Sequence, residues 1–410
     1  MQLACVYPDF RKGSRKYISI VYIILMSLTA IYTMIVCTYT FVLIPEDILV
    51  ASQALHFDIL QIICFSITLT TNTYRKQYAY VHRVIGIGPV EYDEETKNGM
   101  KGIKDKLRIR KKYLLISITI YIAFAGFSTA ILAPFMASLM SGGIKKDIYS
   151  PGGVSLNLPI ASWSPFGTHS NLGYVVSIIM EMLCASEVTV VIVAGDVTLL
   201  VMTQYLTMEL LLLTLALKRL PDRSIRLYKS RYNVEPNQII SITKIKENED
   251  LRKCYTYCLV ESAVHHQKVI KAFARVNKIL SVPIFIAYFS GSIMIAICGI
   301  VMILGSGEIG SLITAFILGF GEILNMLLIS WCGEQIGDAN EKFIMALYST
   351  KWYYTSKVEA RTLQIMMTRS QRPLTLFAGG IVPLNFETFS NVMNSAYSYF
   401  NLVYASKNGK

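Results

Sequence analysis

The sequence is poor in charge. Asp, Glu, Lys and Arg make up 16% of its 410 residues, whereas soluble domains carry about 25%. Hydrophobic residues make up 53%, above the usual range of about 45–50%. This composition excludes an ordinary soluble enzyme and indicates that the apolar excess faces lipid.

The sequence also lacks the short motifs of common enzymes. It has no Gly-rich phosphate loop, no Ser-His-Asp elbow and no HExxH, so we expect neither an enzyme nor a cofactor. Cys254, Cys258, His265 and His266 share a predicted helix. A straight helix cannot wrap four ligands around one ion, so we expect packing residues there and no metal site. None of the eight cysteines lies in a predicted extracellular loop, and we expect no exposed disulfide framework.

Seven stretches are long and apolar enough to cross a bilayer, which takes about 20 residues. Their approximate limits are 17–44, 54–74, 113–141, 172–200, 279–304, 308–332 and 384–405. The first is too long for the hydrophobic region of a cleaved signal peptide, so we expect it to be retained. The predicted fold is therefore an all-α membrane protein with seven transmembrane helices.

The basic residues predict the orientation of these spans. Of the 39 Lys and Arg, 35 lie in the N-terminus and alternate connections, and 4 lie on the other side. Because basic residues near span ends stay cytoplasmic, we expect a cytoplasmic N-terminus and an extracellular C-terminus. A G-protein-coupled receptor has the opposite orientation, and its Asp/Glu-Arg-Tyr and Asn-Pro-x-x-Tyr motifs are absent. The net charge of +12 then faces an anionic leaflet of the lipid bilayer, and we expect no nucleic-acid partner.

Two cytoplasmic segments are predicted to be helical. Residues 248–278 contain no Gly or Pro and should extend the fifth span inward as an amphipathic helix. Residues 338–370 are also helical in character, and Arg372-Pro373 should end them. We therefore divide the chain into three parts. These are a six-span bundle with an outer ligand cavity and long cytoplasmic helix extensions (1–332), a cytoplasmic anchor helix and re-entry (333–383), and a pore-lining seventh span with a short extracellular tail (384–410).

Acidic residues inside spans are costly and are therefore candidate functional sites. They are Asp58, Glu181, Glu187, Asp196, Glu308, Glu322 and Glu387. With no basic partner in any span, the deeper ones should face a watery cavity, be protonated or bond to hydroxyl groups. A membrane transporter that uses these acids is one alternative function, and solvated acids without a specific role are the other interpretation.

The last span carries a polar stripe. Thr388, Asn391, Ser395 and Ser398 follow at steps of 3, 4 and 3, and Leu402 continues the same face. A polar stripe within a membrane must face protein or water. It either lines a pore formed with other subunits, with Leu402 as an apolar constriction, or joins helices within one subunit. The residues alone leave both alternatives open.

The C-terminal third resembles the insect odorant receptor family. The resemblance rests on the run from Arg369 to Leu374 (RSQRPL), on Ala378-Gly-Gly380 and on the run from Ala396 to Phe400 (AYSYF). Asp196 with the following Gln204, the length and the orientation are similar too. The chain lacks the extended second cytoplasmic loop of the shared co-receptor and is more similar to a ligand-tuning subunit. Gustatory receptors of the same superfamily are the close alternative.

The resemblance implies a function. It implies a subunit of a ligand-gated, non-selective cation channel, opened by small volatile organic molecules without a G protein. The partner would be the odorant co-receptor in a heterotetramer, in the plasma membrane of a sensory dendrite. The pore would be lined by Thr388, Asn391, Ser395 and Ser398, with Leu402 as the gate.

The family also places the odorant in the outer half of each subunit, among spans two, three, four and six. No motif identifies the lining, and we select aromatic, Met and small polar residues because such surfaces suit small apolar ligands. The candidates are Phe57, Gln61, Phe65, Ser128, Ile131, Phe135, Tyr174, Met180, Met182, Phe316 and Phe320.

Overall fold

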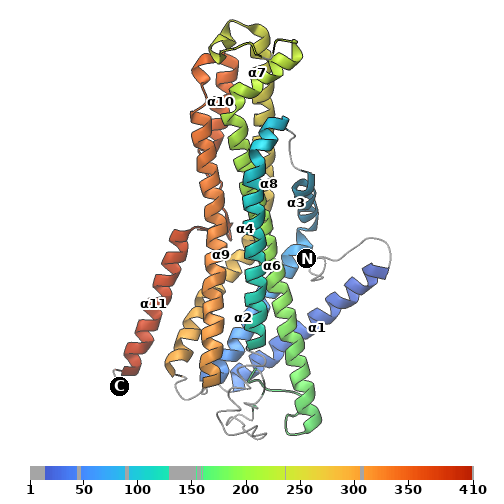
Figure 1. Ribbon diagram of the computed structural model, residues 1–410. Coiled ribbons are helices and arrows are strands. Elements are labelled where there is room, and N and C mark those ends of the chain that lie inside the picture. The colour runs from blue at the N-terminus through green and yellow to red at the C-terminus, as the bar shows by residue number, and fades with distance from the viewer. Residues whose placement is uncertain are drawn as a thin grey trace.

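The computed structural model is an elongated assembly of helices (Figure 1). It describes residues 14–43, 48–87, 92–128, 154, 158, 160–235, 237–304 and 309–408. The α-helices are α1 (Ser14–Leu43), α2 (Ile48–Thr73), α3 (Arg75–Ile87), α4 (Glu94–Phe127), α6 (Asn171–Lys218), α7 (Leu220–Arg231), α8 (Glu249–Leu304), α9 (Ile309–Tyr348), α10 (Lys357–Ser370) and α11 (Phe386–Asn408). Two 3₁₀ turns, η2 (Ile242–Lys246) and η3 (Trp352–Tyr354), and two short strands, β1 (Phe377–Ala378) and β2 (Val382–Pro383), complete these ranges.

The predicted spans coincide with α1, α2, α4, α6, α8, α9 and α11, which confirms the all-α fold. Within the described ranges, five segments qualify as spans by length and hydropathy: Ile23–Leu43, Val50–Thr73, Asn171–Lys218, Glu249–Ile303 and Leu312–Tyr354. The predicted third span is described only as far as Ser128. The polar stripe lowers the hydropathy of α11. The orientation of the termini stays a prediction.

Three helices are much longer than a bilayer requires. The helices α6, α8 and α9 contain 48, 56 and 40 residues. About 20 residues cross the hydrocarbon core, so each helix continues well beyond it. Their far ends gather with α7 and α10 at the top of Figure 1. The predicted inward extension of the fifth span is confirmed, because α8 runs without interruption from Glu249.

The segment 338–370 is not one continuous helix, which corrects the prediction. The helix α9 ends at Tyr348 and α10 begins at Lys357. The new helix starts at Ser356, whose side chain accepts a hydrogen bond from the Val358 backbone N–H. Glu359 follows Ser356 at the capping-box spacing, and the two side chains are hydrogen bonded. This local start signal explains why the chain begins a second helix.

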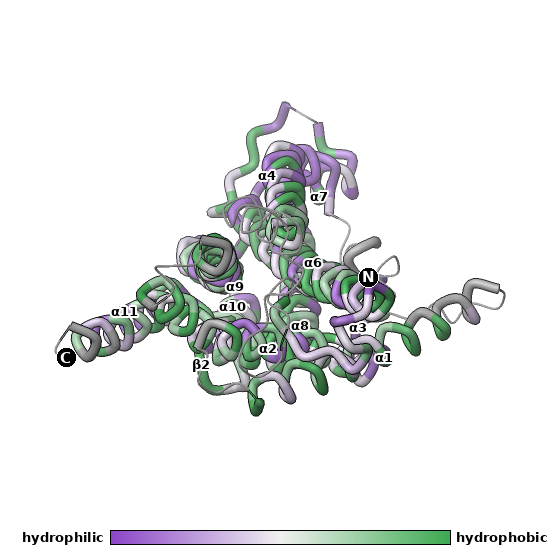
Figure 2. The backbone as a smooth tube through the Cα atoms, turned by 90° about the horizontal axis from the view of Figure 1, so that it is seen from below, coloured by the Kyte–Doolittle hydropathy of each residue, from purple (hydrophilic) through white to green (hydrophobic). Residues whose placement is uncertain are grey.

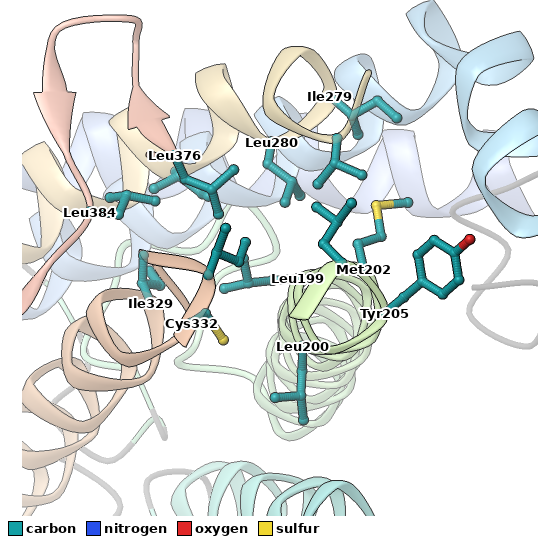
Figure 3. Close-up of a cluster of buried hydrophobic side chains, with 14 of the residues drawn as sticks. Leu199, Leu200, Met202, Tyr205, Ile279, Leu280, Ile329, Cys332, Leu376 and Leu384 are labelled. Carbon is teal, nitrogen blue, oxygen red and sulfur yellow. The ribbon is translucent and has the colours of Figure 1, made fainter. Parts of the chain in front are cut away.

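A buried cluster connects α6, α8 and α9 with the strand hairpin that precedes α11. Figure 3 shows Leu199 and Met202 from α6 facing Leu280 from α8, with Leu376 and Leu384 from the hairpin region beside them. The hairpin turns at Gly379 and Gly380, where φ is +60° and +76°. Glycine is required there because L side chains rarely adopt this conformation. The Gly379 N–H also donates to the Ser281 carbonyl at 2.9 Å, which attaches the base of α11 to α8.

Paired charges connect the helices at the end of the bundle where α7 lies, which we call the α7 end. Arg223 of α7 is 4% exposed, and it pairs with Asp93 (Nε to Oδ1, 3.3 Å) and with Glu261. Arg226 pairs with the other Asp93 oxygen at 2.6 Å. Burial alone would raise the pKa of Asp93, but hydrogen bonds from Thr96 and Arg226 and the nearby guanidinium charges hold it below its ordinary value.

Histidine 265 extends this polar network into the interior. It is completely buried, and both ring nitrogens have partners: the Tyr92 hydroxyl lies 2.7 Å from Nδ1 and Glu209 Oε2 lies 3.0 Å from Nε2. Cys254 and Cys258 are both buried, and Cys258 belongs to the neighbouring apolar cluster. No group of three or more metal-ligating side chains occurs among the described residues.

Candidate functional site

A large cavity lies between α4, α6 and α9. Its volume is about 1000 Å³, and α2 contributes Phe57 while α11 contributes Phe386. Most of the wall is apolar, for example Ile192, Leu318 and Trp331. Small-molecule sites usually enclose about 300–1000 Å³ behind mostly apolar walls, so this cavity has the size and chemistry of a ligand site. Helices α2, α4, α6 and α9 correspond to spans two, three, four and six, which the family resemblance places around the ligand.

Two polar residues of the wall are held by other parts of the protein. Arg110 lies 4.5 Å above the Trp331 ring, and its Nη1 is 3.4 Å from Gln335 Oε1. The Tyr121 hydroxyl donates to the Ile317 carbonyl at 2.7 Å and so connects α4 to α9. These residues shape the cavity with their polar ends already occupied.

Other polar groups of the wall are not held in this way. His56 is 3% exposed, and its Nε2 has no hydrogen-bond partner in the described structure. Asn325 Oδ1 is also buried without a hydrogen-bond partner there. Asp196 and Glu322 also line the cavity. Asp196, Glu322 and Asn325 additionally line a smaller cavity of about 60 Å³ that extends toward α2 and α8. They therefore form a polar partition between the two spaces.

The predicted ligand-binding residues are dispersed in the structure. Phe57 lies in the wall of the large cavity. Gln61 is buried and its Nε2 donates to Cys184 Sγ at 3.1 Å, while Met180 borders a separate space of about 10 Å³. Ser128 is fully buried, and Phe65, Phe316 and Phe320 are 64%, 62% and 47% exposed. Tyr174 and Met182 are half-buried residues of α6 that do not line the large cavity. Ile131 and Phe135 lie outside the described residues. The ligand roles of these residues stay predictions.

Sequence analysis missed most of the wall. His56 and Asn325 are polar residues inside predicted spans, and a search that included neutral polar side chains would have found them beside the acids. No comparable signal distinguishes Tyr121 or Trp331. Aromatic residues are common in spans, and only the packing of α4 against α9 turns these two toward the cavity.

Two of the other predicted intramembrane acids, Glu181 and Glu187, have hydrogen-bond partners. Glu181 accepts from the Ile160 backbone N–H at 3.0 Å and from the Ser162 hydroxyl at 3.1 Å. Glu187 accepts from the Thr29 hydroxyl at 2.7 Å. These two acids follow the predicted alternative of bonding to hydroxyl groups, and Glu181 attaches the segment before α6 to that helix. Glu308 lies outside the described residues.

The helix α11 has two different faces. Phe389, Val392 and Met393 pack against the main core, and Ala396 is 8% exposed. Along the stripe, Asn391, Ser395 and Ser398 are exposed, Leu402 is 71% exposed and Thr388 is half-buried. The stripe hydroxyls donate to backbone carbonyls: Ser395 to Asn391 (2.9 Å), Ser398 to Asn394 (2.8 Å) and Thr388 to Pro383 (2.7 Å).

The stripe is therefore turned away from the helices of its own chain. Viewed along the bundle, α11 lies at the margin of the molecule (Figure 2). The recorded hydrogen bonds of its hydroxyls connect no second helix of the described chain. Bonding between helices of one subunit, one of the two alternatives, thus has no support in this geometry. The pore role stays a prediction.

Comparison with known proteins agrees with this architecture. The solved structure of the insect olfactory receptor OR5 from Machilis hrabei in complex with eugenol superimposes with a TM-score of 0.78. The match covers 99% of this chain and 95% of that one at 14% sequence identity. At this identity the likeness shows a shared fold.

Curated relatives match over a shorter region. The chain is 25% identical to Odorant receptor 85b of Drosophila melanogaster over 145 residues, 35% of this chain and 37% of that receptor. It is 30% identical to Putative odorant receptor 19b of the same species over 140 residues, 34% of this chain and 36% of that protein. The match thus spans about a third of each relative.

A family model described as 7tm Odorant receptor matches residues 47–397. This covers the region from the beginning of α2 through about the first half of α11. The family consists of receptors, which confirms the expectation that the chain is not an enzyme. The chain is a multi-pass membrane protein that belongs to the insect odorant receptor family.

Proposed function

We propose that the chain is the ligand-binding subunit of a non-selective cation channel that small volatile organic molecules open. It acts with the odorant co-receptor in a heterotetramer at the plasma membrane and needs no G protein. Family membership supports this proposal, and the OR5 structure contains eugenol, a small organic molecule. In the three-part division of the chain, the six-span part binds the ligand, residues 333–383 anchor the subunit and α11 lines the pore.

One observation carries the proposal: the large cavity extends to the base of α11. Phe386, the first residue of α11, is part of the cavity wall. Its backbone N–H donates to Glu334 Oε2 of α9 at 3.2 Å. A ligand that fills this end of the cavity therefore touches the helix with the polar stripe. Opening follows when the ligand binds the open arrangement more tightly than the closed one.

The exposed stripe supplies the ion path in this proposal. Thr388, Asn391, Ser395 and Ser398 are neutral and interact with hydrated cations without strong selection. Leu402 narrows the path and closes it by dewetting when the helices of several subunits approach. A pore needs such a ring because one helix cannot enclose water.

Current recording after co-expression with the co-receptor tests this function. A broad panel of volatile molecules should evoke inward current, and Phe386→Ala should lower the maximal current because it removes the contact between cavity and pore helix. Phe41→Ala is the matched control, since Phe41 of α1 is 42% exposed against 43% for Phe386 and lies outside the cavity wall. A silent membrane with both subunits at the surface, or equal losses in the two variants, would contradict the proposal.

Leu402→Ser tests the gate separately. A small polar residue should raise the basal conductance or alter the ion selectivity, because it removes the apolar barrier to water. Leu172→Ser, at an 80% exposed position of α6, is the control and should leave both unchanged. If neither property changes in a Leu402 variant that reaches the surface, Leu402 is not the gate.

A transporter is the second candidate, because Asp196 and Glu322 face the large cavity. It predicts saturating ligand flux without unitary currents, so single-channel recording separates the two functions. Epitope tags in unpermeabilised cells test the orientation. The C-terminal tag should be accessible and the N-terminal tag inaccessible, and the reverse result would favour a G-protein-coupled receptor. A response to non-volatile tastants alone would favour a gustatory receptor.

A further inference from the structure

Three of the polar residues in the wall of the large cavity, Asp196, Glu322 and Asn325, carry acceptor oxygens and lie on two helices. Asp196 comes from α6, while Glu322 and Asn325 lie one turn apart on α9. All three residues line both the large and the small cavity. The partition therefore gathers two acids and an amide at one place in a mostly apolar wall.

Among the described residues, no Lys or Arg forms a recorded ion pair with the acids of this partition. Arg110 is the one basic side chain in the described cavity wall, and it lies against Trp331 and Gln335. Glu181 and Glu187 differ from this pair, because hydroxyl and backbone donors of the protein serve them.

Two neutral polar atoms in the same cavity wall have no hydrogen-bond partner in the described structure. Asn325 Oδ1 is buried without a donor, and His56 Nε2 has no partner although the residue is 3% exposed. Both residues belong to the cavity wall. Leaving buried polar atoms unpaired costs free energy, and intramembrane acids are retained where they serve a function.

The backbone of α8 leaves room for one of these acids. A Cβ atom at Gly291 would lie 3.3 Å from Glu322 Oε2, closer than most side-chain contacts. The glycine therefore lets α8 approach the Glu322 carboxylate closely. On the other side, Glu322 faces the large cavity together with Ile192 and Leu318.

We infer that the large cavity binds a small protonated amine with an apolar body. The ammonium group donates to Asp196, Glu322 and Asn325 Oδ1, and the body lies along the apolar wall toward Phe57. An ammonium group fits because it offers three donors and a positive charge to a cluster of acceptors. A neutral alcohol of the same length offers one donor and no charge. This inference rests on the proposed function and specifies its ligand class.

The test compares octylamine with 1-octanol, two probes of equal chain length. In cells with the co-receptor, half-maximal current should need at least about tenfold less octylamine than octanol. Asp196→Asn and Glu322→Gln should each raise the half-maximal octylamine concentration about tenfold and change that of octanol less than about threefold. Glu187→Gln is the matched control, a buried acid of α6 outside the cavity wall, and should leave the amine preference unchanged.

A second measurement reads binding without a current. Octylamine should raise the melting temperature of the purified wild-type receptor, and this shift should be lost in Asp196→Asn but kept in Glu187→Gln. If octylamine raises the melting temperature but no ligand evokes a current, the inference is supported and the channel function is contradicted. Currents with octanol but not octylamine, or equal losses for both probes in the acid variants, would overturn the inference and leave the channel function standing.

Discussion

Arg223 and His265 at the α7 end of the bundle differ from His56 and Asn325 in the large cavity in how their polar atoms are paired. At the α7 end, Arg223 pairs with two carboxylates and His265 has a partner on each ring nitrogen. In the cavity, His56 and Asn325 each have an unpaired polar atom. Buried polar groups are normally paired because an unpaired one costs about 1–3 kcal/mol. The contrast indicates that Arg223 and His265 support the fold, whereas His56 and Asn325 are available to a ligand in the proposed function.

The two regions also differ in what their apolar residues gain from burial. The apolar cluster at the α7 end includes Leu251, Tyr255, Phe343 and Leu363, all 2% exposed or less. In water, burying each such side chain contributes about 1.5–3 kcal/mol. Between membrane helices this driving force is missing, because lipid is as apolar as the core, and packing and polar contacts decide the association. A cavity is therefore cheaper to keep within the membrane part.

Of the predicted changes, breaking the buried charge network around Arg223 should lower the free energy of unfolding most. Arg223→Met leaves Asp93 and Glu261 without their buried partner and should lower the free energy of unfolding by about 3–5 kcal/mol. Arg226→Met removes a 33% exposed side chain and should cost less than about 1 kcal/mol. Thermal unfolding of the detergent-solubilised protein measures both. Equal losses would show that burial of the pair is not what matters.

Two of the buried histidines, His265 and His56, provide the sharpest test of the comparison. His265→Leu leaves the Tyr92 hydroxyl and Glu209 unpaired and should cost about 1–3 kcal/mol of stability. His56→Leu removes an unpartnered nitrogen and should leave the stability of the ligand-free protein unchanged or raise it. The same unfolding measurement serves both variants. A similar loss at both positions would end the distinction between a supporting network and a ligand wall.

Protonation of Asp93 at acid pH should change the free energy of unfolding least. The pKa of Asp93 is lower in the folded protein than its ordinary value, so the folded state binds this proton less readily than the unfolded state. The resulting stability is fully present above about pH 4 and is lost as pH falls through the lowered pKa. Because Asp93 is about one third exposed, we expect less than about 1 kcal/mol.

Unfolding temperatures between about pH 3 and 6 measure this contribution. Asp93→Asn should flatten the acid limb, and Arg226→Met should flatten it in part because Arg226 donates to the Asp93 carboxylate. An acid limb of unchanged slope in Asp93→Asn would assign the pH dependence to other groups.

Local signals in the sequence predicted much of the fold. The unbroken extension of α8 followed from residues 248–278, a segment without Gly or Pro. The interruption between α9 and α10 was missed, although Ser356 and Glu359 carry a capping-box signature. The intramembrane acids were identified, but not which of them have partners.

The wall of the cavity could not be predicted in the same way. Phe57 and Phe65 are eight residues apart on one helix, yet Phe57 lines the cavity and Phe65 is 64% exposed. Both are aromatic residues in a span, and helices in a membrane can be apolar on every side. Hydropathy therefore carries no information about which apolar face meets protein.

The sequence by itself determined the spans, the long helix extensions and the polar stripe of α11, because these depend on residue type and spacing along one helix. Tertiary structure alone decided that Asp196, Glu322 and Asn325 line the same two cavities, where the two acids have no recorded ion pair among the described residues, and that Phe386 joins the large cavity to α11. These relations arise from the packing of helices that are distant in sequence, where the facing side chain determines whether a polar group is paired or left for a ligand.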